Sequence, residues 1–153
     1  MKEAATLQQC RIEDLDAVQD LGRLVSYLRS SLVSHLDAAL APMDLTAAQY
    51  IVVVLLARGK VKTLAELCDH MVYDRGAMSR LLSRLEDKGL VTKQQSVQDR
   101  RSTLLYLTAK GRQLHPEILP MVNQIYQQAL TGFTETEQQQ FVELLFRAIH
   151  NLK

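Results

Sequence analysis

Side chains suited to recognising a polyanion lie between residues 74 and 91, in the segment DRGAMSRLLSRLEDKGLV. At 100° per residue, one face of a helix here would be apolar and face a core: Met78, Leu81, Leu82 and Leu85. The opposite face is small or rich in hydrogen-bond donors: Gly76, Ser79, Arg80 and Ser83, with Arg75 and Arg84 at its edges. Small side chains let a helix seat deeply in a DNA major groove, where serine and arginine bind base edges or phosphates. The alternative is that serine and glycine are simply tolerated on a solvent-facing helix.

A second basic feature follows in the sequence. Residues 91–95 and 102–107 are rich in Val, Thr, Leu and Tyr, and they flank the polar tip 96–101, which predicts a β-hairpin. Arg100 and Arg101 at this tip are suited to a minor groove, where narrow segments concentrate negative potential. Asp99 would repel phosphate, so we expect it to form an ion pair that orients Arg101.

Amphipathic helices must position these two features. Apolar residues at three-or-four spacing predict a long helix over 12–40, and Thr46 with Gln49 predicts a capping box that starts a helix ending at Gly59. Thr63 and Glu66 repeat that spacing before a short helix over 64–71, and Asp74 is the expected N-cap of the next. Thr108 should cap a helix that is bent or interrupted by its two early prolines and ends near Thr131, and Thr134 and Glu137 should cap the last. The fold class is mainly α with a small β-hairpin wing, a winged helix-turn-helix.

Charge is distributed unevenly along the 153 residues. The net charge is +1, but residues 58–112 carry twelve Lys/Arg and six Asp/Glu, a local net charge of +6 that leaves −5 on the rest. A basic centre between acidic ends is typical of a polyanion-binding module. The N-terminal segment lacks the apolar core of a signal peptide and no apolar run could span a bilayer, so we expect a cytoplasmic protein without membrane contact.

The sequence lacks the usual signs of an enzyme or a metalloprotein. The four histidines are scattered, and there is no nucleophile elbow or phosphate-cradling glycine loop. Cys10 and Cys68 cannot form a disulfide framework and lack a neighbouring metal-ligand cluster, so we interpret both as reduced thiols, with a redox role left open. We expect no enzymatic activity, no metal and no cofactor.

Four segments carry a resemblance to a known family: LTAAQYIVVVLL (45–56), TLAELCDHM (63–71), MSRLLSRLEDKGLV (78–91) and DRRSTLLYLTAKGRQL (99–114). In this order and spacing the chain resembles the MarR (multiple antibiotic resistance regulator) family of winged helix-turn-helix transcription factors. The resemblance implies a homodimeric DNA-binding regulator, usually a repressor, that a small aromatic or amphipathic effector releases from a pseudo-palindromic operator. It also implies a recognition helix over about 75–88 and a wing arginine at Arg101, with Asp99 as its partner.

The resemblance also divides the chain. Residues 1–153 form one MarR-type domain, with a DNA-binding lobe over 45–108 and helical dimerisation regions over 10–42 and 109–153. The apolar stripes of the end regions are longer than the lobe could cover, which favours a second copy. For the effector we name six residues near the junction of lobe and end helices: Tyr27, Ser31, His35, Met43, Tyr50 and Met71. The alternative function is a winged-helix protein-interaction module without DNA binding.

Overall fold

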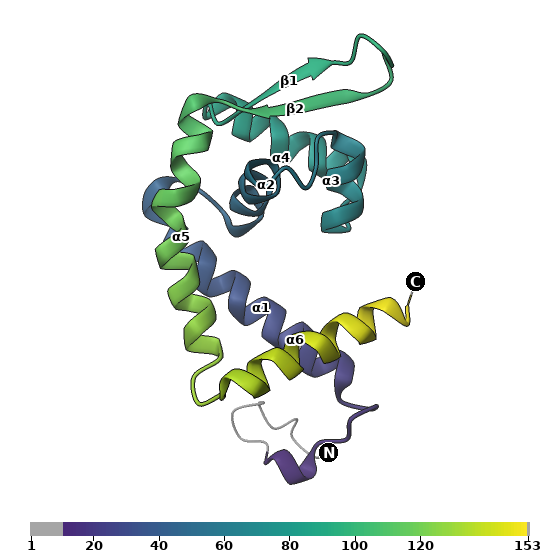
Figure 1. Ribbon diagram of the computed structural model, residues 1–153, viewed down its shortest axis with the longest axis vertical. Helices are drawn as coiled ribbons and strands as arrows, with labels where there is room; N and C mark the ends of the chain where they lie inside the picture. The colour runs from purple at the N-terminus through teal and green to yellow at the C-terminus, as the bar shows by residue number, and fades with distance from the viewer. Residues whose placement is uncertain (1–10, 153) are drawn as a thin grey trace, which may run out of the picture.

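The computed structural model describes residues 11–152, and most of them are helical (Figure 1). In chain order, these residues form two short 3-10 turns, six α-helices and one hairpin: η2 Ile12–Asp14, α1 Leu21–Leu40, η3 Ala41–Met43, α2 Ala47–Ala57, α3 Leu64–Met71, α4 Arg75–Asp87, β1 Val91–Gln95, β2 Thr103–Leu107, α5 Ala109–Ala129 and α6 Glu135–His150. This architecture confirms the expected mainly α class with a β-hairpin wing.

Side-chain caps begin the later helices, as the spacing predicted. Three helix starts are capping boxes. The side chain of the threonine at 46, 63 or 134 accepts a hydrogen bond from the backbone N–H three residues on, and the side chain of that residue, Gln49, Glu66 or Glu137, accepts one from the backbone N–H of the threonine. The side chains of Asp74 and Thr108 also accept a hydrogen bond from the backbone N–H three residues on, at the starts of α4 and α5, but these two caps are not reciprocal. Local sequence therefore fixes where five of the helices begin.

The first helix starts later than its apolar pattern predicted. Residues 12–20 form a 3-10 turn and bends, and α1 begins at Leu21. The carboxylate of Asp16 accepts hydrogen bonds from the N–H groups of Val18 (2.9 Å) and Gln19 (2.8 Å), and Asp20 accepts one from the N–H of Asp16 (3.0 Å). These side-chain bonds compete with the helical ladder, so the predicted start near Ile12 is wrong.

The predicted interruption of the fifth helix is also wrong, because α5 runs unbroken through Pro116 and Pro120. The two prolines are four residues apart, so they share one helix face, and both are exposed. The carbonyl groups that lose a helical partner therefore lie on the solvent side, where water can satisfy them.

The core lies in the lobe formed by α2, α3, α4 and the hairpin, and the C-terminal half of α1 and the first half of α5 close it. Its fully buried side chains include Leu40, Val52, Leu67, Met78, Leu82, Leu85 and Ile118. The strands pair antiparallel with Val91 opposite Leu107 and Lys93 opposite Leu105. Val91, Leu105 and Leu107 place one face of the hairpin on the core.

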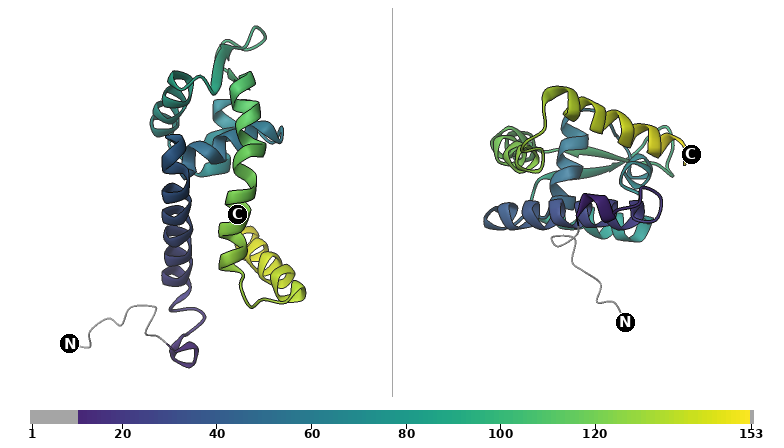
Figure 2. Two further views of the ribbon diagram at one scale, coloured as in Figure 1. Left: turned by 90° about the vertical axis from the view of Figure 1, so that its left-hand side faces the viewer. Right: turned by 90° about the horizontal axis from the view of Figure 1, so that it is seen from below.

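The end helices extend away from this lobe. In Figure 1 α1 and α6 cross in projection, but Figure 2 shows them on opposite sides of the molecule. No residue of α6 is buried, and Val142, Leu144, Phe146 and Ile149 are more than half exposed. No single helix of the described residues is long and apolar enough to cross a membrane. Residues 21–43 and α2 would be long and apolar enough together, but the chain bends by 83° between them.

Candidate nucleic-acid interface

Helix α4 separates an apolar face from a polar one, as its sequence predicted. Met78, Leu82 and Leu85 are buried, whereas Gly76, Ser79, Arg80 and Arg84 are exposed, as is Arg75 at the first position of the helix. Asp74 accepts a hydrogen bond of 2.9 Å from the N–H of Ala77 and so fixes the helix start. The exposed face presents three arginines on a rigid element.

Gly76 leaves room for a close approach at the start of α4. A Cβ atom at this position would lie 3.2 Å from Oδ1 of Asp74 and 3.4 Å from Nη1 of Arg80. The guanidinium of Arg80 therefore passes over the first turn of the helix, beside the capping carboxylate. The lack of a side chain at Gly76 lets the Arg80 guanidinium lie close to the backbone N–H groups of the first turn.

Ser83 differs from the other predicted contact residues, because it is only half exposed and its hydroxyl has a partner within the protein. Nζ of Lys93, on β1, lies 3.2 Å from Oγ of Ser83 and 2.8 Å from Oε2 of Glu86. The hydrogen bond from Lys93 lowers the pKa of Glu86 below its usual value of 4.5. Ser83 therefore joins α4 to the hairpin.

The wing tip is a compact turn closed by its own polar groups. The N–H of Ser96 donates to the carbonyl of Ser102 (2.9 Å), and the N–H of Asp99 donates to Oγ of Ser96 (3.2 Å). Oδ1 of Asp99 accepts a hydrogen bond of 3.0 Å from the backbone N–H of Arg101. The expected ion pair between the Asp99 carboxylate and the Arg101 guanidinium is therefore wrong, because the carboxylate shapes the turn instead.

The arginines of α4 and the wing tip differ from two lysines of the lobe in their partners. Within residues 11–152, no carboxylate pairs with the guanidinium of an arginine on α4 or the tip: Arg75, Arg80, Arg84, Arg100 and Arg101. Lys93 and Lys88, in contrast, are partly buried and paired, and Lys88 reaches Oδ2 of Asp44 at 3.1 Å. The arginines remain available to an external anion.

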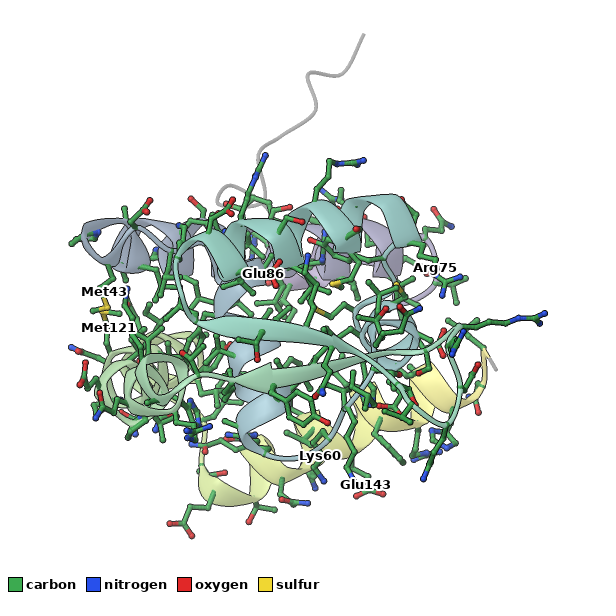
Figure 3. The ribbon with its side chains drawn as sticks, turned by 90° about the horizontal axis from the view of Figure 1, so that it is seen from above. Met43, Lys60, Arg75, Glu86, Met121 and Glu143 are labelled. Carbon is green, nitrogen blue, oxygen red and sulfur yellow. The ribbon has the colours of Figure 1, made fainter. Side chains whose placement is uncertain are left out.

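These basic elements share one end of the molecule. Figure 3 looks down on α4 and the hairpin lying side by side, with Glu86 between them and Arg75 at the end of α4 nearest the wing tip. In Figure 1 the same elements lie at the top, away from α6 and the start of α1. The arrangement offers one helix and one loop to a single extended anion.

Comparison with known proteins identifies the architecture. A family model described as the MarR family matches residues 43–102. An HTH-type transcriptional repressor of Mycobacterium tuberculosis is 31% identical over 125 residues, which cover 82% of this chain and 90% of that protein. The multiple antibiotic resistance protein MarR of Escherichia coli is 30% identical over 129 residues, covering 84% and 90%.

The chain belongs to the MarR family.

Solved structures of the family agree with this membership. The transcriptional regulator SlyA superposes with a TM-score of 0.80 at 25% identity, over 87% of this chain and 94% of that one. A variant of Escherichia coli MarR in complex with operator DNA superposes with a TM-score of 0.76 at 30% identity, over 84% and 92%. This MarR-family chain is thus a transcriptional regulator of the winged helix-turn-helix type.

The six residues predicted to bind an effector in this MarR-family chain do not share one cavity. Met71 lines a cavity of about 460 Å³, together with Leu28, Leu36, Ile51, Tyr126 and Leu145. Ser31 and His35 line a second, Tyr50 a third and Met43 a fourth, and Tyr27 is exposed on α1 outside all of these. Sequence position near the junction did not predict which side chains converge.

Two of the six have internal partners instead. Nδ1 of His35 lies 2.8 Å from the carbonyl oxygen of Ser31 one turn earlier. The hydroxyl of Tyr50 lies 3.2 Å from Nδ1 of His115 on α5. Burial, and secondarily Arg58, lowers the pKa of His115 below 6.5, and burial raises the pKa of Tyr50 above 10. This pair joins α2 to α5.

Among residues 11–152, neither Cys68 nor a cluster of metal ligands forms part of the interface. Across residues 11–152, no group of three or more His, Cys, Asp or Glu side chains could hold a metal ion. Cys68 is a free, half-buried thiol in α3. Cys10 lies outside the described residues.

Four residues that organise the MarR-family lobe were missed by the sequence interpretation: Asp37, Lys88, Lys93 and Gly111. Each acts between two different elements of the fold, so no motif within one element identifies it. For Lys93 the sequence offered one signal. Lys93 is two residues after Val91, so a charged side chain lies on the same face of the strand as an apolar one that is expected to be buried.

Proposed function

We propose that this MarR-family regulator binds operator DNA as a homodimer, with α4 in the major groove and the wing tip in the adjacent minor groove. The observation that carries the proposal is the set of exposed arginines on α4 and the tip that have no carboxylate partner among residues 11–152. A free guanidinium retains its full capacity to bind phosphate or guanine.

The two elements take different tasks. Arg80 and Ser79, on the exposed face of α4, are placed to read base edges, with Arg75 and Arg84 directed to the flanking backbone. Arg100 and Arg101, on the tip, suit the narrower groove, where contacts depend on shape and charge. Gly76 keeps the first turn of α4 free of a side chain, and Asp99 holds the tip in its turn. The structure of an Escherichia coli MarR variant with operator DNA supports the proposal that this related chain binds an operator.

Exposed apolar surface on the end helices supports a dimer. Leu21 and Val25 of α1 are about half exposed, and α6 exposes a longer apolar series: Val142, Leu144, Phe146 and Ile149. Figure 2 shows α1 and α6 on opposite sides of the molecule, and these apolar side chains stay exposed within the protomer. A two-fold dimer through these helices would place the two copies of α4 about 34 Å apart, which matches a pseudo-palindromic operator.

The cavity of about 460 Å³ that Met71 lines is the best candidate for an effector site in this chain. Its walls come from all of α1, α2, α3, α5 and α6, so a ligand there would contact both the end helices and the DNA-binding lobe. The lining is mostly apolar, with Arg29, His70, Tyr73 and Tyr126 as polar groups, which suits a small amphipathic molecule. Such a ligand would release DNA only if it favoured a spacing of the two lobes that the operator does not fit.

The proposal is tested by measuring binding of the purified protein to a labelled duplex from its own upstream region, against a shuffled duplex of equal length. We expect tighter binding to the upstream duplex and a steep loss of affinity between 50 and 200 mM salt, by about 10³-fold or more if six phosphates are contacted. Sedimentation in the same buffers should give the mass of two chains. No binding to either duplex would refute the proposal and favour a protein-interaction module.

DNA binding would also set where the protein acts. A regulator of this kind works in the compartment that holds the chromosome, which is the cytoplasm of a prokaryotic cell.

A further inference from the structure

The wing leaves the lobe as a two-stranded hairpin that has little to hold its outer half. From Gln94 to Arg101 every residue except Ser96 is exposed. A hairpin of two strands is only marginally stable by itself. Its direction therefore depends on the contacts at its base.

The β2 edge is anchored through the backbone. The N–H of Leu105 donates to the carbonyl of Lys62 (2.9 Å), and Thr63 forms a β-bridge with Leu104. These bonds hold one edge of the hairpin, and Val91, Leu105 and Leu107 seat its base on the core.

The β1 edge is anchored by a side chain. Nζ of Lys93 lies 2.8 Å from Oε2 of Glu86 and 3.2 Å from Oγ of Ser83, both on α4. The ammonium group is partly buried and Glu86 lies between α4 and β1 in Figure 3. Among the hydrogen bonds and ion pairs found in residues 11–152, this is the one that links a wing side chain to α4.

We propose that Lys93 is a positioning residue, held by Glu86 and Ser83, that fixes the direction of the wing relative to α4 and so sets the distance between the two DNA-contacting elements. The inference rests on the proposed DNA binding, since only a bound duplex requires that distance. It also changes the role of Ser83 from a base contact to an anchor for Lys93.

The leverage of this anchor is large. The tip lies about five residues beyond Lys93, or about 16 Å at the rise of a β-strand, so a swing of about 10° at the anchor moves the tip by about 3 Å. A displacement of that size exceeds the range over which a hydrogen bond keeps its geometry. The arginines of the tip and of α4 would then no longer fit adjacent grooves together.

The main rival is that Lys93 simply supplies positive charge to a phosphate. The two explanations differ in sign for Glu86→Ala. If charge alone matters, removing a carboxylate near DNA frees Lys93 and tightens binding. If position matters, the same change weakens binding although the net charge becomes more favourable.

The experiment compares Glu86→Ala with Asp87→Ala by fluorescence anisotropy on the upstream duplex, in wild-type and Arg101→Ala backgrounds. Asp87 is the next residue of α4, and its variant removes the same charge. Its carboxylate is exposed and has no hydrogen bond or ion pair in the described chain. We expect Glu86→Ala to weaken binding about three- to tenfold when Arg101 is present and less than twofold when it is absent, which is a coupling. Asp87→Ala should bind as well as wild type or better, and Lys93→Met should reproduce Glu86→Ala.

The outcomes separate this inference from the proposed function. Tighter binding by Glu86→Ala, or an equal loss in both Arg101 backgrounds, would overturn the positioning role while DNA binding stands. Failure of the wild-type protein to bind any duplex would instead refute the proposed function and this inference with it. Thermal unfolding of each variant identifies a loss that comes from misfolding, and such a loss would be equal in both backgrounds.

Discussion

Oδ1 of Asp37, on α1, accepts a hydrogen bond of 2.6 Å from the backbone N–H of Ala47, the first residue of α2. This N–H is one of those that no helical partner can satisfy, and Thr46 satisfies another at the same helix start. The bond spans the corner where α1 with η3 meets α2 at 83°. A side chain of one end helix therefore sets the orientation of the first helix of the lobe.

Loss of this bond should destabilise the fold. We expect Asp37→Ala to lower the free energy of unfolding by about 1–2 kcal/mol, the usual cost of removing a helix cap. Urea unfolding followed by circular dichroism measures it. Asp69→Ala, which removes an exposed carboxylate of α3 without a partner in the described chain, is the control and should change little. Equal stability of the two variants would contradict the role of Asp37.

Gly111 is required by a close approach of α5 to Leu90, which lies between α4 and β1. The first turn of α5 packs on the carbonyl of Leu90, which also accepts the N–H of Thr108 at 3.0 Å. A Cβ atom at position 111 would overlap that carbonyl oxygen and lie 3.2 Å from Cδ2 of Leu107. We expect Gly111→Ala to cost about 1–3 kcal/mol or more through overpacking, despite the better helix propensity of alanine.

The same urea assay checks Gly111→Ala. Gly22→Ala is the matched control, because a Cβ at residue 22 of α1 meets nothing within 4 Å. That variant should be as stable as wild type or slightly more stable.

His115 should make stability depend on pH near neutrality. Burial and the charge of Arg58 lower its pKa below 6.5, so the unfolded chain binds this proton more readily than the folded one. The contribution of the neutral ring is complete above pH 6.5 and is lost as the pH falls below it. The melting temperature should drop between pH 7.5 and 5.5, and His115→Gln should reduce that drop.

Carboxylates with lowered pKa values in the folded protein do not titrate between pH 7.5 and 5.5. Hydrogen bonds from backbone N–H groups lower the pKa values of Glu66 and Glu137 below 4.5, so their contributions are lost only in more acidic solution. An unchanged drop in His115→Gln would show that another group is responsible.

Arg80 and Arg101 should affect binding in different ways. Arg80→Ala is expected to narrow the difference between the operator and a shuffled duplex, by about 1–3 kcal/mol if the residue reads a base. Arg101→Ala should weaken binding to both duplexes by similar factors, because the minor groove and the backbone carry less sequence information. Anisotropy titrations on the two duplexes measure both effects. If neither variant changes binding, the DNA-contacting face is wrongly placed.

Local chemistry made much of the fold predictable from the sequence. The threonines at 46, 63 and 134 and the acceptors three residues later act within one helical turn, so their spacing alone predicted the helix starts. The hairpin and the exposed face of α4 follow from residue alternation and helical periodicity in the same way. These patterns need no knowledge of distant contacts.

The predictions that failed have two physical causes. Some local hydrogen bonds compete with the predicted structure, and some roles depend on contacts between separate elements. Apolar spacing at Leu15 and Val18 predicted a helix, but the carboxylate of Asp16 captured the N–H groups that the helix needed. Asp99 was predicted to pair with a guanidinium, but a backbone N–H two residues away is a nearer donor. The roles of Lys93 and Ser83 depend on a strand and a helix meeting at one register, which no single segment encodes.

Helix α6 has sixteen residues and buries none of them within the protomer. A helix with so little tertiary packing has little to resist local opening, so its amides should exchange with solvent quickly in dilute samples. If a second copy covers its apolar face, exchange should slow as protein concentration rises, by mass action. The number of molecules in a cell would then govern how much of this regulator is fully folded, before any signal reaches it.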